Sequence, residues 1–228
     1  PITMPYRPHG VPTAFDFDGD GDEEIGIDML SYMAYLRGED GSFAYVCHSP
    51  NIRADGAIYA GHLYNTFCPV YRTAADNEPH WFVKGGFGPF GLMNPDVVSG
   101  VWRVDHDYDV PPAIGMIDVD ADGELEVGYA AINSPKFVCR DLWTGHVEWE
   151  LALPHAPNAP CISADFDGDG KGEFLIGAFC IGTSQQGVGE LRWQSPVATG
   201  WAAIADFDGD GQGEIACARR GEVVILNE

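Results

Sequence analysis

Carboxylate side chains recur at positions 1, 3, 5 and 9 of four short segments of the chain. The segments are DFDGDGDEE from Asp16, DVDADGELE from Asp118, DFDGDGKGE from Asp165 and DFDGDGQGE from Asp206. Four carboxylates in so short a loop repel one another strongly unless a cation lies between them. A hard cation such as Ca²⁺ takes six to eight oxygen ligands, which one tightly folded loop can supply. We therefore interpret each segment as a calcium loop, which predicts up to four bound Ca²⁺ ions.

The predicted ligands share these four positions, and position 7 of the first loop adds a backbone carbonyl. They are Asp16, Asp18, Asp20, Asp22 and Glu24 in loop 16–24; Asp118, Asp120, Asp122 and Glu126 in loop 118–126; Asp165, Asp167, Asp169 and Glu173 in loop 165–173; and Asp206, Asp208, Asp210 and Glu214 in loop 206–214. Glycines at positions 4 and 6 permit the positive φ angles that wrap a loop around an ion, although Ala121 replaces the first of them in the second loop. Mg²⁺ fits less well because it prefers octahedral geometry and keeps its own waters. The alternative is a solvated acidic turn, which four copies with the same glutamate offset argue against.

The flanks of the loops indicate β-strands, whereas helices flank the loop of an EF-hand, whose closing glutamate stands at position 12. PTAF runs into the first loop and EIGIDM runs out of it. The later loops run out into LEVGYAAI, EFLIGAFCI and EIACA. These segments are short, apolar and β-branched, and they are too brief for helices.

The loops begin at residues 16, 118, 165 and 206, and a period of about 40–50 residues with several strands per repeat is typical of a β-propeller. The long first interval then holds two units. The second of these, about residues 48–112, lacks a calcium loop and contains a strand, turn and strand in LYNTFCPVYRTAADNEPHWFVKG. Other units add a hairpin, MAYLRGEDGSFAYV with its turn at 38–41 and FVCRDLWTGHVEWELAL with its turn at 144–145, and GEVVILN begins a further one.

The predicted fold is therefore all-β, a single β-propeller region over residues 1–228 with about five units of four strands each. The last unit is incomplete unless PITMPY at the N-terminus pairs with it, so we expect an incomplete propeller or part of a larger one, completed by further blades or chains. Trp143, Trp149 and Trp193 are expected in the core between blades. The six cysteines form no CxxC pair, and they are either buried thiols or disulfides.

The motif D-x-D-G-D-G-x-x-E followed by a short apolar strand resembles the FG-GAP/VCBS-type calcium-binding propeller repeats. Such repeats occur in integrin α-chain heads, bacterial surface proteins and rhamnogalacturonan lyases. The hairpin DLWTGHVEWEL is also similar to blades of quinoprotein-like propellers. The resemblance covers the four loops and their strands. It implies calcium sites that brace the blades and do not perform chemistry, in a protein that is extracellular or at a cell surface.

Charge and motifs exclude several classes of function. The formal net charge of −23 would repel nucleic acid, and no apolar run reaches the length of a membrane-spanning helix. The chain has no G-x-S-x-G, Walker, H-E-x-x-H or dinucleotide motif.

Two hypotheses about function remain, and both depend on residues 48–112, which are rich in aromatic residues, glycine and proline. The first is a structural, glycan-binding or protein-binding module, with an acidic polysaccharide or a cell-surface protein as its partner. The alternative is a polysaccharide lyase, similar to rhamnogalacturonan lyases, that acts by β-elimination. A lyase needs a base and a positive charge beside the uronate carboxylate, for which the candidates are His62, Tyr71, Arg72, His80 and Lys84.

Overall fold

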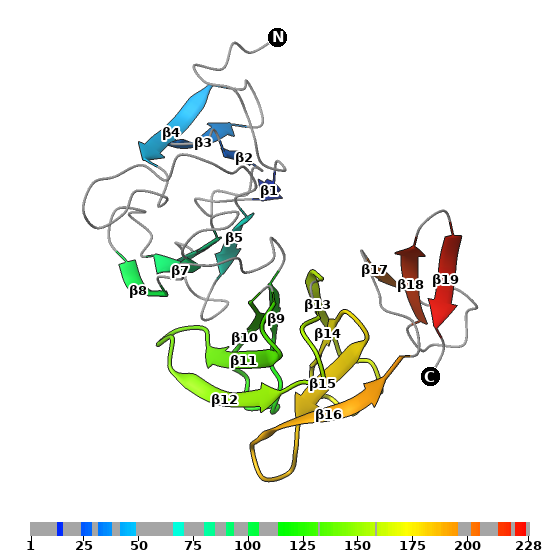
Figure 1. The fold of residues 1–228 in the computed structure, drawn as a ribbon. Coiled ribbons are helices and arrows are strands. Elements are labelled where there is room, and N and C mark those ends of the chain that lie inside the picture. The colour runs from blue at the N-terminus through cyan, green and yellow to red at the C-terminus, as the bar shows by residue number, and fades with distance from the viewer. Residues whose placement is uncertain are drawn as a thin grey trace. The chain divides into compact units, whose positions relative to one another are not determined.

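The computed structural model describes residues 13–15, 24–28, 32–37, 42–48, 66–70, 80–84, 90–93, 100–104, 114–131, 133–157, 159–195, 202–205, 214–219 and 222–226. The chain divides into two compact units, Pro1–Pro112 and Ala113–Glu228. All regular elements in the described ranges are β-strands, β1 to β19 in chain order (Figure 1). These ranges hold no helix that is long and apolar enough to span a bilayer.

The N-terminal unit contains two four-stranded antiparallel sheets, each with its strands in chain order. The strands of the first are β1 (Thr13–Phe15), β2 (Glu24–Asp28), β3 (Tyr32–Arg37) and β4 (Phe43–His48). Those of the second are β5 (Thr66–Val70), β6 (His80–Lys84), β7 (Phe90–Met93) and β8 (Gly100–Val104). The predicted hairpin of residues 33–46 is thus confirmed as β3 and β4, and the backbone N–H of Arg37 donates to the carbonyl of Ser42 across its turn (2.9 Å).

The C-terminal unit contains three antiparallel sheets, two of four strands and one of three. The first consists of β9 (Gly115–Ile117), β10 (Glu126–Ala130), β11 (Lys136–Asp141) and β12 (Val147–Ala152). The second consists of β13 (Cys161–Ala164), β14 (Glu173–Ile176), β15 (Phe179–Thr183) and β16 (Gly189–Gln194). The third consists of β17 (Ala202–Ala205), β18 (Glu214–Arg219) and β19 (Glu222–Leu226). The predicted turn at 144–145 joins β11 to β12, with the Asp141 carboxylate accepting from the Thr144 N–H (2.6 Å).

The sheet β5–β8 extends the strand, turn and strand predicted within residues 48–112 to four strands. Its strands β7 and β8 lie within GGFGPFGLMNP and VWRVDHDYDVPP. The rings of Phe82, Phe90 and Trp102 pack together with centroids 6.0–6.3 Å apart. Gly91 is required where β8 passes, because a Cβ there would lie 2.2 Å from the Trp102 carbonyl oxygen. Gly91 therefore permits close strand pairing.

Two hydrophobic clusters hold the three sheets of the C-terminal unit together. Phe137, Cys139 and Trp149 of the first sheet pack against Phe174 and Phe179 of the second. A second cluster joins Leu175 and Cys180 of β13–β16 to Ile215 and Cys217 of the last sheet, with Trp193 partly buried against it. The expectation that the tryptophans pack in the core between blades is confirmed for Trp149 and in part for Trp193, which is only partly buried. Trp143 is buried as well.

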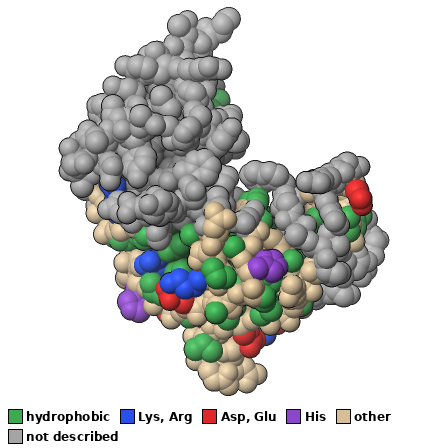
Figure 2. All heavy atoms as spheres, in the orientation of Figure 1, with side chains coloured by type: hydrophobic (Ala, Val, Ile, Leu, Met, Phe, Trp, Pro, Cys, Tyr) green, Lys and Arg blue, Asp and Glu red, His purple; other side chains and the backbone are tan. Residues whose placement is uncertain are grey.

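Four cysteines in the described ranges, Cys139, Cys161, Cys180 and Cys217, are free and buried thiols. Burial raises the pKa of the Cys161 thiol to about 12 and also raises that of Cys139 and Cys217. The side chains of the other two cysteines of the sequence lie outside the description. Hydrophobic side chains of the described residues also reach the molecular surface, as the face in Figure 2 shows.

Candidate metal centres

The structure describes two of the four predicted loops, each between the first two strands of a sheet. Loop 118–126 joins β9 to β10, and loop 165–173 joins β13 to β14. The closing glutamate of each loop begins the outgoing strand and pairs with the last residue of the incoming one, Glu126 with Ile117 and Glu173 with Ala164. Strand pairing therefore brings position 9 of the loop beside position 1.

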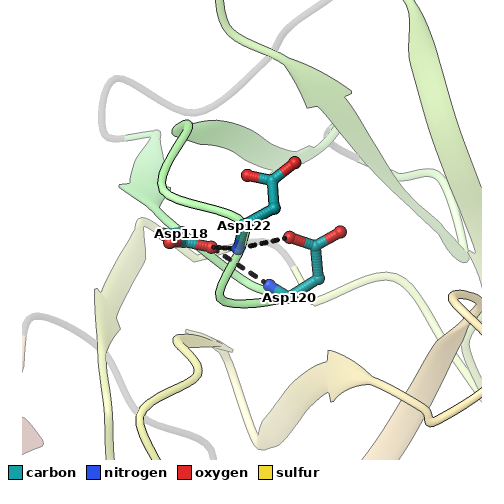
Figure 3. A group of neighbouring side chains, drawn as sticks. All are labelled: Asp118, Asp120 and Asp122. Carbon is teal, nitrogen blue, oxygen red and sulfur yellow. Dashed lines mark hydrogen bonds between the residues drawn. The ribbon is translucent and has the colours of Figure 1, made fainter.

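The carboxylate of Asp118 organises the first of these loops. Its Oδ1 accepts hydrogen bonds from the backbone N–H groups of Asp120, Ala121 and Asp122 (3.3, 2.7 and 3.2 Å), and its Oδ2 accepts from Gly123 (2.8 Å). Ala121 and Gly123 adopt positive φ angles of 65° and 92° to make this turn. As Figure 3 shows, Asp118, Asp120 and Asp122 then lie together, with one oxygen of each within 4.8 Å of the others.

Loop 165–173 contains backbone hydrogen bonds to the aspartates at positions 1 and 3, as loop 118–126 does. Asp165 Oδ2 accepts from the Gly170 N–H (3.0 Å), and Asp167 Oδ1 accepts from the Asp169 N–H (3.1 Å). Gly168 and Gly170 take the positive φ angles, 71° and 88°. Here the carboxylate oxygens that lie within 4.8 Å of one another come from Asp165, Asp167 and Glu173. Each loop thus brings together three of its four predicted side chains.

The two closing glutamates are buried. Glu126 and Glu173 are 5% and 2% exposed, and the Oε2 atom of each accepts the backbone N–H of position 2, Val119 (2.8 Å) or Phe166 (2.9 Å). These bonds are possible because the position 2 side chains are themselves buried and hold the backbone in place.

Burial raises the pKa of both carboxyl groups, to about 8 for Glu126 and about 7 for Glu173. The N–H bonds oppose this increase, and the three aspartates of the same loop add to it: Asp120, Asp122 and Asp118 for Glu126, and Asp167, Asp169 and Asp165 for Glu173.

One oxygen of Glu173 tests whether these residues fit a cation. Oε1 is buried and accepts no hydrogen bond from any described residue. A buried carboxylate oxygen without a partner is costly, and a cation removes that cost. All donors that meet in the two loops are carboxylate oxygens, the ligand type that Ca²⁺ prefers. The residues therefore fit a hard divalent cation, the class to which Ca²⁺ belongs.

The two loops are also linked to each other, which the sequence analysis missed. The N–H of Gly172 donates to the carbonyl of Asp118 (2.7 Å). A Cβ on Gly172 would lie 2.3 Å from the side chain of Ile117. Nearby, the Ser163 hydroxyl accepts from the N–H of Met116 (3.2 Å) and donates to its carbonyl (3.0 Å). The available signal was glycine at position 8 in loops 165–173 and 206–214.

The other predicted ligands lie mostly outside the described residues. This holds for Asp16, Asp18, Asp20, Asp22, Asp206, Asp208 and Asp210. Glu24 begins β2, although its side chain is outside the description, and Glu214 begins β18 and is 5% exposed. These two positions match those of Glu126 and Glu173 in their own sheets, because Glu24 pairs with Phe15 and Glu214 with Ala205.

The lyase candidates are also largely outside the description. His62, Tyr71 and Arg72 fall there entirely. His80 begins β6 and is half-buried, and Lys84 ends the same strand with its side chain outside the description. The grouping of these five residues stays a prediction, as does the pairing of PITMPY with the last sheet.

Comparisons with known proteins support the fold. No protein-family model and no curated protein matches the chain. It is similar to the crystal structures of the V. cholerae biofilm matrix protein Bap1 (TM-score 0.61, 16% identity, 95% of this chain and 37% of that chain) and of BBS1N in complex with ARL6DN (0.59, 12%, 96% and 66%). It is also similar to BamB from Moraxella catarrhalis (0.54, 11%, 92% and 56%).

These likenesses show the fold alone, since the identities are low. BBS1N and BamB are β-propeller proteins, and the chain spans between 37% and 66% of the three similar chains. The prediction of an all-β, propeller-like chain built mostly of four-stranded sheets is thereby confirmed.

Proposed function

We propose that the chain is a calcium-binding region of a β-propeller, in which each of up to four loops holds one Ca²⁺ and fixes the connection between two strands of a blade. The observation that carries the proposal is the unpaired Oε1 of buried Glu173, grouped with the carboxylates of Asp165 and Asp167. A bound Ca²⁺ would give this oxygen the positively charged partner that it lacks. In the other described loop the ion would be held by Asp118, Asp120 and Asp122.

The role we propose for these ions is structural. The aspartate carboxylates accept hydrogen bonds from backbone N–H groups of their own loops, so they already belong to the architecture of the turn. The bond from Gly172 to Asp118 couples one loop to the next. An ion that orders one loop therefore also stiffens the contact between neighbouring sheets.

We further propose an extracellular or cell-surface scaffold that binds a glycan or a protein. Loops that depend on calcium fill readily where the ion is millimolar, and weak extracellular modules use this range. A rigid propeller presents its loops as a binding surface. No observation in the described ranges favours the polysaccharide lyase over this scaffold.

Thermal unfolding of the chain with calcium, with magnesium and with excess chelator tests the proposal. We expect calcium to raise Tm, because a ligand that binds only the folded state stabilises it by mass action. Glu173→Gln should reduce this shift without lowering Tm in chelator, since it removes a buried charge. Glu222→Gln, the same change at an exposed position, is the matched control. A Tm that is equal in calcium and chelator would overturn the proposal.

A further inference from the structure

The two described loops are joined through one peptide group, the one between Asp118 and Val119. Its N–H, which belongs to Val119, donates to Oε2 of the closing glutamate Glu126 of the same loop (2.8 Å). Its carbonyl, which belongs to Asp118, accepts the N–H of Gly172 in the other loop (2.7 Å). Because a peptide group is planar, these two bonds cannot be oriented independently. A change in loop 118–126 that rotates the peptide group therefore also acts on Gly172.

Both ends of this connection lie beside candidate cation ligands. Asp118 is one of the grouped aspartates of its loop, and its carboxylate also accepts backbone hydrogen bonds that shape the turn. Gly172 immediately precedes Glu173, whose buried Oε1 accepts no hydrogen bond from a described residue. A cation that fixes the carboxylate of Asp118 restrains the carbonyl of the same residue. It thereby restrains the backbone that leads into Glu173.

The connection is closely packed, so the hydrogen bond has little freedom to adjust. A Cβ on Gly172 would lie 2.3–2.6 Å from three carbons of the Ile117 side chain. Beside it, the Ser163 hydroxyl bonds to both the N–H and the carbonyl of Met116 (3.2 and 3.0 Å). Tightly packed groups transmit a displacement to one another because they cannot absorb it in empty space.

The sequence places the glycine of this connection selectively. Three of the predicted calcium loops belong to a sheet that follows another sheet of the chain. Position 8 is glycine in two of them, as Gly172 and Gly213, and the preceding sheet of each also has a predicted calcium loop. Position 8 is Leu125 in the other, and there the preceding sheet has residues 71–79, without alternating aspartates, between its first two strands. Glycine at position 8 thus accompanies a predicted calcium loop in the preceding sheet.

We propose that loops 118–126 and 165–173 bind calcium cooperatively, so that an ion in either loop raises the affinity of the other through the hydrogen bond from Gly172 to Asp118. This inference rests on the proposed function, because it requires both loops to bind Ca²⁺. The first ion restrains both loops, and the second therefore loses less conformational entropy when it binds. The effect is reciprocal, since a coupling free energy between two sites acts equally in both directions. Electrostatic coupling between the two sites is a separate effect, which salt screens.

Calcium titrations of the full chain, followed by NMR at two backbone amides, measure each loop separately. The N–H groups of Gly123 and Gly170 each donate to the position 1 aspartate of their own loop (2.8 and 3.0 Å), so each signal reports one site. A chelator sets the free calcium concentration, and NaCl at about 0.5 M screens the charges. Asp167→Asn together with Glu173→Gln disables one site, and the affinity measured at Gly123 should then fall about fivefold.

The reverse experiment should give the same factor. Asp120→Asn together with Asp122→Asn disables the other site while each amide oxygen can still accept a backbone hydrogen bond. The affinity measured at Gly170 should fall about fivefold. Unequal factors would mean that the substitutions act on the neighbouring loop by a route other than the coupling of two calcium sites, which would overturn the proposal.

A substitution at the connection should uncouple the two loops. In Gly172→Ala the new Cβ overlaps Ile117 and pushes Gly172 away from the Asp118 carbonyl. Disabling one loop should then change the affinity of the other by less than about twofold. In Lys171→Ala, the control at the preceding and more exposed position, the factor should stay at about fivefold. The disabling substitutions remove the same charges in both backgrounds, so electrostatics cannot produce this difference.

Hydrogen exchange of the Gly172 amide tests the coupling without any change at that residue, and so keeps the test valid if Gly172→Ala does not fold. In the chain with Asp167→Asn and Glu173→Gln, calcium should slow this exchange about fivefold, because an ion in loop 118–126 holds the Asp118 carbonyl in place. The slowing should disappear when loop 118–126 is disabled as well.

The outcomes separate this inference from the proposed function. Suppose that the Gly123 and Gly170 signals respond to calcium, but neither affinity depends on the other loop and the Gly172 exchange does not slow. The cooperative link is then overturned, and the proposed function stands. An equal factor in Gly172→Ala and Lys171→Ala would also overturn the link. If neither signal responds to calcium in the wild type, the proposed function fails, and the inference fails with it.

Discussion

The loops 118–126 and 165–173 share the hydrogen bonds from position 6 to the aspartate at position 1 and from position 2 to the closing glutamate, but their residues differ at positions 2, 4, 7 and 8. Ala121 stands where the second loop has Gly168, and Leu125 stands where it has Gly172. In loop 165–173 the closing glutamate joins two aspartates and leaves one oxygen unpaired, whereas in loop 118–126 three aspartates meet. The frame of the turn is thus set by the aspartate at position 1 and by the buried residue at position 2. Positions 4, 8 and 9 then determine which carboxylates meet at the cation site and whether the loop bonds to the neighbouring sheet.

The largest expected effect is that of pH on the stability of the calcium-free protein. Both closing glutamates have a pKa raised above the ordinary value of 4.5, to about 7 for Glu173 and about 8 for Glu126. A raised pKa contributes stability that is fully present below 4.5 and is lost as pH rises through the folded-state value. The free energy of unfolding without calcium should therefore fall between pH 5 and 8.5, at about 1.4 kcal/mol for each unit of pKa difference as an upper limit.

Denaturant titrations at several pH values in calcium-free buffer measure this loss. Glu173→Gln should remove the contribution that is lost between about pH 4.5 and 7, and Glu126→Gln the contribution that is lost between about pH 4.5 and 8. Saturating calcium should abolish the loss in the wild type, because the ion favours the ionised carboxylates. A calcium-free stability that rises with pH over this range would contradict the expectation.

The next largest effect concerns position 8. Gly172→Leu places in one loop the residue type that the other has at Leu125. The side chain would overlap Ile117 and push Gly172 away from the Asp118 carbonyl. We expect a loss of about 2–3 kcal/mol in the free energy of unfolding, measured by denaturation in calcium. Lys171→Leu, at the preceding and more exposed position, is the control, and an equal loss there would mean that the contact between the loops is unimportant.

The same contrast shows how much the sequence can predict. The alternating aspartates with glycine predicted the turns and the strands on either side, because that chemistry is local. The unpaired oxygen of Glu173 could not be predicted, since it depends on which carboxylate oxygen accepts the hydrogen bond from the Phe166 N–H. Strands β7 and β8 were not predicted, because their segments are rich in glycine and proline; the need for Gly91 beside the Trp102 backbone is visible only in the structure. The link between Gly172 and Asp118 joins residues of different sheets, which no local pattern shows.

A smaller effect separates the two closing glutamates in calcium binding. Glu173 shares its site with Asp165 and Asp167, whereas the group in the other loop consists of three aspartates without Glu126. Glu173→Gln should therefore weaken one class of calcium site by about tenfold, or 1.4 kcal/mol, and Glu126→Gln should weaken its own site less. Calorimetric titration with calcium measures both. Equal losses would show that Glu126 is also a ligand when the ion is bound.

The smallest effect concerns position 4, where the two loops adopt the same backbone with different residues. Ala121 has a φ of 65°, close to the 71° of Gly168, although only glycine adopts this region without steric cost. Ala121→Gly should raise the free energy of unfolding by up to about 1 kcal/mol, because relief of strain exceeds the added freedom of the unfolded chain. Gly168→Ala should lower it by about the same amount. Denaturation of both variants in saturating calcium measures these two changes in the free energy of unfolding. Changes of the same sign would mean that the two turns do not have the same backbone conformation at position 4.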